Sequence, residues 1–85
     1  MPFVTTFYGI IITMNFNEHN PPHFHARYGD YKARFDFSGE LVDGEMPKSK
    51  IALIKAWAIL HKEELEANWI LAASKETIVR IEPLK

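Results

Sequence analysis

Residues 23–37 read HFHARYGDYKARFDF, and their alternation of polar and apolar side chains predicts a β-hairpin with strands over 23–28 and 31–37. Gly29 at the first central position of the turn favours a type II′ geometry. The register places three pairs on an apolar face: Tyr28 with Tyr31, Ala26 with Ala33, and Phe24 with Phe35. The opposite face pairs Arg27 with Lys32, His25 with Arg34, and His23 with Asp36. A slip by one residue would mix the two faces, so the pattern specifies this register strongly.

Outward from the hairpin, residues 7–16, FYGIIITMNF, alternate at period two and predict one strand. Residues 17–22 predict a loop, because the two prolines remove hydrogen-bond donors and restrict the residues before them. Residues 41–42 would form a further short strand, and residues 77–81, TIVRI, fit a last strand that Pro83 ends.

Pro47 is suited to opening a helix, and an apolar stripe at steps of three or four residues follows it. The stripe consists of Ile51, Ile54, Trp57, Ala58, His61, Leu65, Trp69 and Ala72. It fits either one long helix or two helices with a break near His61. We therefore expect a single domain over 1–85 of the α+β class. A small antiparallel sheet of three to four strands, the first strand and then the hairpin, would carry one or two C-terminal helices on one face.

Composition narrows the classes of function. Ten Lys and Arg residues against eleven Asp and Glu residues give a net charge of -1, which argues against a dedicated non-specific nucleic-acid binder. The chain has no cysteine, which excludes disulfides, thiolate metal sites and cysteine nucleophiles. The N-terminus lacks the pattern of a signal peptide, and its apolar run is much shorter than the roughly 20 residues of a membrane span. We expect a cytoplasmic protein without membrane association.

The polar face of the hairpin carries residue types suited to acid–base chemistry on a phosphodiester. His23 and His25 are the catalytic candidates, and Asp36 opposite His23 could orient its imidazole. Arg27, Lys32 and Arg34 form a cationic row that could neutralise phosphate oxygens. Arg27 opposite Lys32 is unfavourable by itself, and an anionic ligand would relieve that repulsion. This chemistry requires no cofactor.

A metal site is the alternative interpretation of the same segment. His23 and His25, two residues apart on a strand, project to the same side, and His19 and Glu18 precede them in the loop. Such a set of imidazole and carboxylate ligands could hold zinc or another divalent metal. The third interpretation, and the commonest for such a face, is a solvated hairpin without a site.

The chain resembles the DUF4160 family of small prokaryotic proteins. The resemblance lies in residues 7–37, in the MPKSKIALIKAWAILHKEELEANW segment of residues 46–69 and in the closing IEPL, and its most specific parts are PPHFH at 21–25 and LHKEEL with the following tryptophan at 60–69. It implies a gene context like that of toxin–antitoxin pairs. Residues 23–54 are also similar, more weakly, to part of the HicA-type messenger-RNA-cleaving toxins, and this likeness implies that His23 or His25 is catalytic.

Two hypotheses of function follow. The first is a toxin–antitoxin-type component with metal-independent ribonuclease or RNA-contacting activity, whose partners would be RNA and an antitoxin or another protein. The second is a non-catalytic module that binds a divalent metal or a partner through EHNPPHFH, residues 18–25. Either is compatible with an oligomer. A chelator separates them, because a metal module loses its ligand and a metal-independent ribonuclease keeps its activity.

Overall fold

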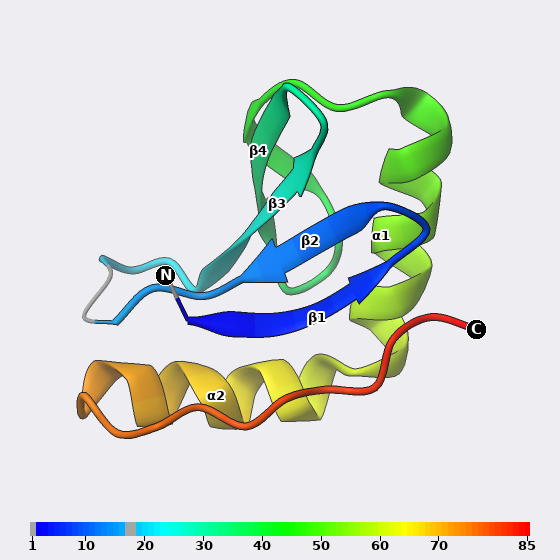
Figure 1. The fold of residues 1–85 in the computed structure, drawn as a ribbon. Coiled ribbons are helices and arrows are strands. Elements are labelled where there is room, and N and C mark those ends of the chain that lie inside the picture. The colour runs from blue at the N-terminus through cyan, green and yellow to red at the C-terminus, as the bar shows by residue number, and fades with distance from the viewer. Residues whose placement is uncertain (1, 17–18) are drawn as a thin grey trace.

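A computed structural model describes residues 2–16 and 19–85 of the chain. Its elements follow the order β1 (Phe3–Phe7), β2 (Ile10–Thr13), β3 (His23–Tyr28), β4 (Tyr31–Asp36), β5 (Leu41–Gly44), α1 (Lys48–Leu60) and α2 (Lys62–Ala73). The strands form one five-stranded sheet in sequence order, and every neighbouring pair is antiparallel (Figure 1). The α+β class is confirmed, whereas the predicted sheet of three to four strands is wrong.

The extra strand comes from the N-terminus, where one strand over residues 7–16 was expected. The chain turns back at Tyr8 and Gly9, whose φ angles of 48° and 80° are both positive, as a type I′ hairpin turn requires. The strand after the turn keeps the predicted alternation, because Ile10, Ile12 and Met14 are fully buried. Residues before the turn form β1, which pairs with β2.

The β3–β4 hairpin confirms the predicted register at all six pairs, from His23 opposite Asp36 to Tyr28 opposite Tyr31. Gly29 has a positive φ of 57°, whereas the φ of Asp30 is not positive. A type II′ turn requires this combination at its two central residues. Phe24 and Phe35 are fully buried, with ring centroids 5.8 Å apart. The hairpin therefore directs its apolar face into the core and its polar face, apart from the buried His23, away from it.

Strand β5 extends two residues beyond the predicted 41–42 and forms the other edge of the sheet. The register shifts between Arg34 and Phe35, where β4 meets β5. Gly44 has a φ of 93°, and a Cβ there would overlap the carbonyl oxygen of Lys32. Glycine at position 44 thus allows the end of β5 to lie directly against β4.

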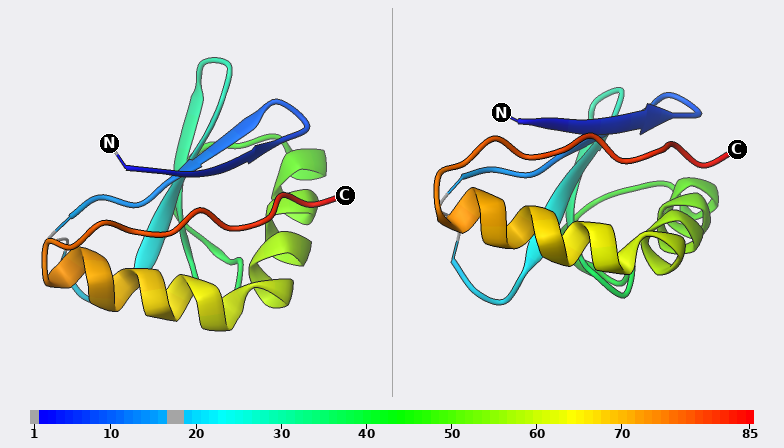
Figure 2. Two further views of the ribbon diagram at one scale, coloured as in Figure 1. Left: turned by 60° about the horizontal axis from the view of Figure 1, so that its bottom comes forward. Right: turned by 90° about the horizontal axis from the view of Figure 1, so that it is seen from below.

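Two helices, rather than one, cover a single face of the sheet (Figures 1 and 2). The break falls at His61, which lies between the end of α1 and the start of α2. The ring of His61 lies 5.7 Å from that of Trp57, and its Nδ1 lies 2.6 Å from a carboxylate oxygen of Glu64. Trp57, which is fully buried, packs between the helices and the sheet. The buried core comprises Val4, Phe7, Ile10, Ile12, Met14, Phe24, Ala26, Ala33, Phe35, Phe37, Met46, Ile54, Trp57, Ala58, Leu65, Ala72 and Ile81.

The C-terminal segment is not the strand predicted for residues 77–81. It runs beside β1 and along α2 (Figure 2). Ile81 N–H donates to the carbonyl of Val4 at 3.2 Å, and Asn68 bonds both backbone groups of Val79. Among the described residues, the bond from Ile81 is the segment's one backbone bond to β1, and it does not make a ladder; side-chain bonds from Asn68 and Trp57 also hold the segment in place. In the part of the chain that the structure describes, no helix has the length and apolar character to span a membrane.

Candidate functional site

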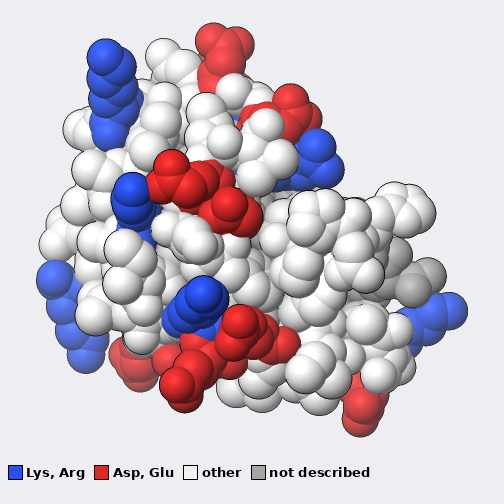
Figure 3. Space-filling view, turned by 180° about the vertical axis from the view of Figure 1, so that it is seen from behind, with Lys and Arg blue, Asp and Glu red and all other residues white. Residues whose placement is uncertain are grey.

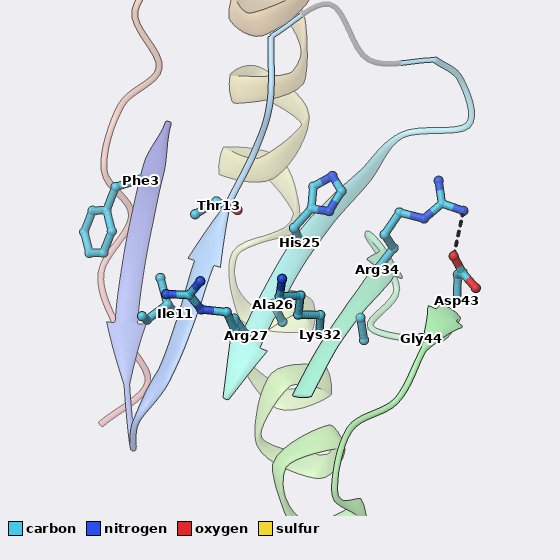
Figure 4. Close-up of a pocket in the computed structure, with 11 residues that line it drawn as sticks. Phe3, Ile11, Thr13, His25, Ala26, Arg27, Lys32, Arg34, Asp43 and Gly44 are labelled. Atoms are coloured by element: carbon cyan, nitrogen blue, oxygen red, sulfur yellow. Dashed lines mark hydrogen bonds and ion pairs between the residues drawn. The ribbon is translucent and has the colours of Figure 1, made fainter. Parts of the chain in front are cut away.

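The polar face of the sheet, opposite the helices, is hollowed, and we call this hollow the open-face hollow (Figure 4). Its volume is about 540 Å³. Strand alternation explains most of its lining, because residues that neighbour the buried ones in sequence point to the other side of the sheet. Ala26 and Ala33 also line it, although both are buried. It is lined by Phe3, Ile11, Thr13, His25, Ala26, Arg27, Lys32, Ala33, Arg34, Asp43 and Gly44.

Three predicted phosphate-binding side chains line this hollow, with Arg27 extending toward Ile11 and Arg34 toward Asp43 (Figure 4). Arg27 and Lys32 lie directly opposite each other on β3 and β4, so their positive charges repel. Arg34 Nη2 lies 3.4 Å from Asp43 Oδ2, and both side chains are substantially exposed. Such an exposed ion pair contributes about 0–1 kcal/mol, and a guanidinium has further N–H donors. The hollow is therefore a locally cationic surface in a chain of net charge -1.

The cationic character does not extend over the whole molecule. On the side shown in Figure 3, acidic side chains lie among the basic ones, and several acidic side chains adjoin one another at the lower edge. Exposed charges are screened beyond about 10 Å at 0.1 M salt. The cationic row of Arg27, Lys32 and Arg34, and not the net charge of the chain, therefore determines the electrostatic potential that an anion experiences at the open-face hollow.

His25 is the histidine of the open-face hollow, and it is half-buried. Its Nε2 lies 3.3 Å from the side-chain nitrogen of Asn15. An amide NH₂ group only donates, so with this amide orientation Nε2 accepts and the neutral ring carries its proton on Nδ1. On β4 its direct neighbour is Arg34, as predicted.

His23 is buried and has a different environment from His25. Its Nδ1 donates a hydrogen bond to the carbonyl oxygen of Pro21 at 2.9 Å. The ring lies 5.3 Å from that of His25 and 5.5 Å from that of Trp69 on α2. The two histidines are therefore neighbours, but His23 lies under the proline loop and at α2, while His25 faces the open-face hollow.

Asp36 lies opposite His23 in the register, but its carboxylate also has a role in the following turn. Oδ1 accepts hydrogen bonds from the backbone N–H groups of Ser38 and Glu40 at 2.9 and 3.0 Å. Glu40 in turn lies 2.8 Å from Lys55 Nζ on α1, and this hydrogen bond and charge raise the pKa of Lys55. Asp36 thus holds the turn between β4 and β5 close to α1.

We expect Asp36→Ala to lower the free energy of unfolding by about 1–2 kcal/mol, because two backbone donors lose a charged acceptor. The change is measured by urea denaturation beside Asp43→Ala, which removes a carboxylate of the same sheet in an exposed ion pair. The control should cost less than about 1 kcal/mol. Equal losses for the two variants would contradict the assigned role of Asp36.

The structure does not bring the described candidate metal ligands of the second hypothesis together in one hollow. His19 and His23 line a second, smaller hollow of about 140 Å³, which we call the loop hollow. His25 lies in the open-face hollow, and Glu18 lies outside the described residues. Within residues 2–16 and 19–85, no three His, Cys, Asp or Glu side chains are grouped closely enough to hold a metal ion. The metal site stays a prediction.

Sequence reasoning missed several residues that line the open-face hollow. Ile11 was predicted to lie in a strand, and its placement on the polar side follows from the burial of Ile10 and Ile12. Phe3 was missed because the strand that carries it was not recognised, although FVTTF is rich in β-branched and aromatic residues. Asp43 and Gly44 were missed because β5 was expected to end at residue 42.

Comparisons with known proteins identify a family and no function. No curated protein and no solved structure matches the chain. The model of a family described as "Domain of unknown function (DUF4160)" matches residues 9–70. Nothing in these comparisons supports the likeness to HicA-type toxins. The match covers strands β2 to β5, the whole of α1 and most of α2, and it shows that the chain belongs to the DUF4160 family.

Proposed function

We propose that the open-face hollow binds RNA through its phosphate groups, in the cytoplasm. The observation that supports this proposal is the placement of Arg27, Lys32 and Arg34, on two adjacent strands, along the lining of one hollow. A phosphate row bound there would remove the repulsion between Arg27 and Lys32. Ile11 and Phe3 add apolar surface beside the cations, which suits a ligand with both charged and planar apolar parts. Sheet faces with this combination are a common RNA-binding surface.

The arrangement supports RNA binding better than RNA cleavage. Metal-independent cleavage of a phosphodiester needs groups that take up and deliver protons at the reacting atoms. Among the described residues that line the open-face hollow, His25 is the only histidine. His23 is buried beside it with Nδ1 bonded to Pro21. We therefore assign the site to contact with RNA, and the antitoxin-like partner stays a prediction from the family resemblance.

The test is the salt dependence of binding to a labelled 12-nucleotide RNA, measured by fluorescence anisotropy in the presence of a chelator. Each phosphate contact on a single strand contributes about -0.7 to the slope of log Kobs against log salt, so three cations predict a slope of about -2. We expect the double variant Arg27→Gln/Lys32→Gln to bring the slope to about -0.7 and to weaken binding at least ten-fold at low salt.

The matched control is Lys62→Gln/Lys85→Gln, which removes two exposed positive charges outside the open-face hollow. It changes the net charge by the same amount, so an effect of overall charge would appear in both double variants. Equal slopes for the two would overturn the proposal. Electrophoresis of the RNA after incubation reports its integrity, and cleavage by the wild type that His25→Ala abolishes would restore the ribonuclease hypothesis.

A further inference from the structure

The loop hollow lies next to the open-face hollow, and Arg34 lines both. Its other walls come from the loop before β3, from the first residue of β3 and from β5: His19, Asn20, Pro21, Pro22, His23 and Val42. Arg34 stands on β4 between these two sources, with its guanidinium held near Asp43. The two hollows therefore share a cation, and a ligand that reaches Arg34 from the open face meets the loop hollow next.

The chemistry of the loop hollow differs from that of the open-face hollow. Pro21, Pro22 and Val42 give it apolar walls, His19 adds a flat aromatic ring, and Arg34 is the one permanently charged residue among the described residues that line it. Asn20 supplies a side-chain amide that can both donate and accept hydrogen bonds. Such a hollow favours an uncharged, planar, heterocyclic group with a polar edge, attached to an anionic group that reaches Arg34.

We propose that the loop hollow receives one unpaired nucleobase of the RNA, whose phosphate lies on Arg34. This inference rests on the proposed function and adds to it that the ligand is single-stranded. Unpaired bases are typically stacked on aromatic side chains and hydrogen-bonded along their edges. His19 would stack on the base, and Asn20 would contact its edge. A base inside a duplex is stacked and paired, so it cannot enter.

Three RNA probes of equal length and charge per strand test this proposal. They are a single strand, the same strand annealed to its complement, and the same strand with abasic ribose at every position. All three present phosphates to Arg27, Lys32 and Arg34. We expect the wild-type protein to bind the single strand about ten-fold more tightly than the abasic strand, as expected for one base stacked on an aromatic ring. When affinity is compared per phosphate, the duplex should bind no more tightly than the abasic strand.

Variants of His19 then separate stacking from charge. His19 is exposed and lies in a loop, so its substitution should leave the fold intact. We expect His19→Ala to weaken binding of the single strand about ten-fold and to leave binding of the abasic strand unchanged. His19→Phe keeps an aromatic ring without a titratable group and should restore binding of the single strand. Val42→Trp, on an exposed edge-strand position that lines the hollow, should fill it and act as His19→Ala does.

The outcomes distinguish this inference from the proposed function. Equal affinity for the single and abasic strands, unchanged by His19→Ala and Val42→Trp, would overturn the nucleobase site and leave phosphate binding intact. Failure of all three probes to bind would overturn both proposals. Restoration of binding by His19→Phe, together with loss in His19→Ala, would support the nucleobase site, because a charge-only role for His19 predicts that both variants bind equally weakly.

Discussion

Replacing Trp57 by alanine is expected to lower the free energy of unfolding by about 3–5 kcal/mol, the usual cost of emptying a large aromatic site in a core. Trp57 is fully buried, and its ring lies 5.6 Å from that of Phe7 and 5.5 Å from that of Phe24. It therefore joins α1 to strands β1 and β3. Its indole Nε1 also donates to the carbonyl oxygen of Glu82 at 2.8 Å, which connects the core to the C-terminal segment.

The loss would be a large share of the total stability. Folded domains are stable by about 0.05–0.15 kcal/mol per residue, which gives roughly 4–13 kcal/mol for 85 residues. Urea denaturation followed by circular dichroism measures the change. Ile59→Ala, at a site 59% exposed on the same helix, is the control and should cost less than about 1 kcal/mol. A loss for Trp57→Ala no larger than that of the control would show that the core does not depend on this side chain.

The β3–β4 hairpin could be predicted from sequence because two independent signals agreed there. A turn glycine fixed the centre of the hairpin, and only one register separated apolar from polar residues on both strands. The same logic placed Arg27, Lys32 and Arg34 on one face, where the structure brings them around one hollow. Cross-strand neighbours are determined by backbone geometry, and backbone register is what a period-two pattern specifies.

The N-terminal hairpin was missed because its turn is centred on Tyr8, a residue type that rarely adopts positive φ. The continuous apolar run on both sides of Gly9 then resembled one strand. The sequence alone could not distinguish these readings, since FVTTF and IIIT are both rich in strand-forming residues. The additional strand matters for the site, because β1 and β2 contribute Phe3, Ile11 and Thr13 to the open-face hollow.

Contacts of individual side chains were less predictable than register. Asp36 and His23 are opposite each other, yet the Asp36 carboxylate bonds the next turn and His23 Nδ1 bonds Pro21. Both partners are backbone groups whose position depends on loop geometry. The loop hollow likewise forms where the proline loop meets β5, two segments separated in sequence by the hairpin. A pattern of polar and apolar residues does not specify such contacts between segments that are far apart in sequence.

Asn68→Ala is expected to lower the free energy of unfolding by about 2–3 kcal/mol and to release the C-terminal segment locally. Asn68 is 2% exposed on α2. Its Nδ2 donates to the carbonyl oxygen of Val79 at 2.7 Å, and its Oδ1 accepts from Val79 N–H at 2.9 Å. Alanine removes both hydrogen bonds and leaves two backbone groups without these partners, each at a cost of about 1–3 kcal/mol when buried. Because the Val79 side chain is exposed, water can recover part of this loss.

Local release should be visible at Ile81, whose N–H donates to Val4 and whose side chain is buried. Amide hydrogen exchange at Ile81 should accelerate in Asn68→Ala by more than the loss of global stability explains, while exchange in the β3–β4 hairpin follows the global change. Glu66→Ala, at an exposed position of the same helix, is the control and should leave Ile81 exchange unchanged. If Ile81 and the hairpin amides accelerated by the same factor, the segment would unfold only with the whole domain. Asn68 would then be a core residue with no separate role in holding the C-terminal segment to β1.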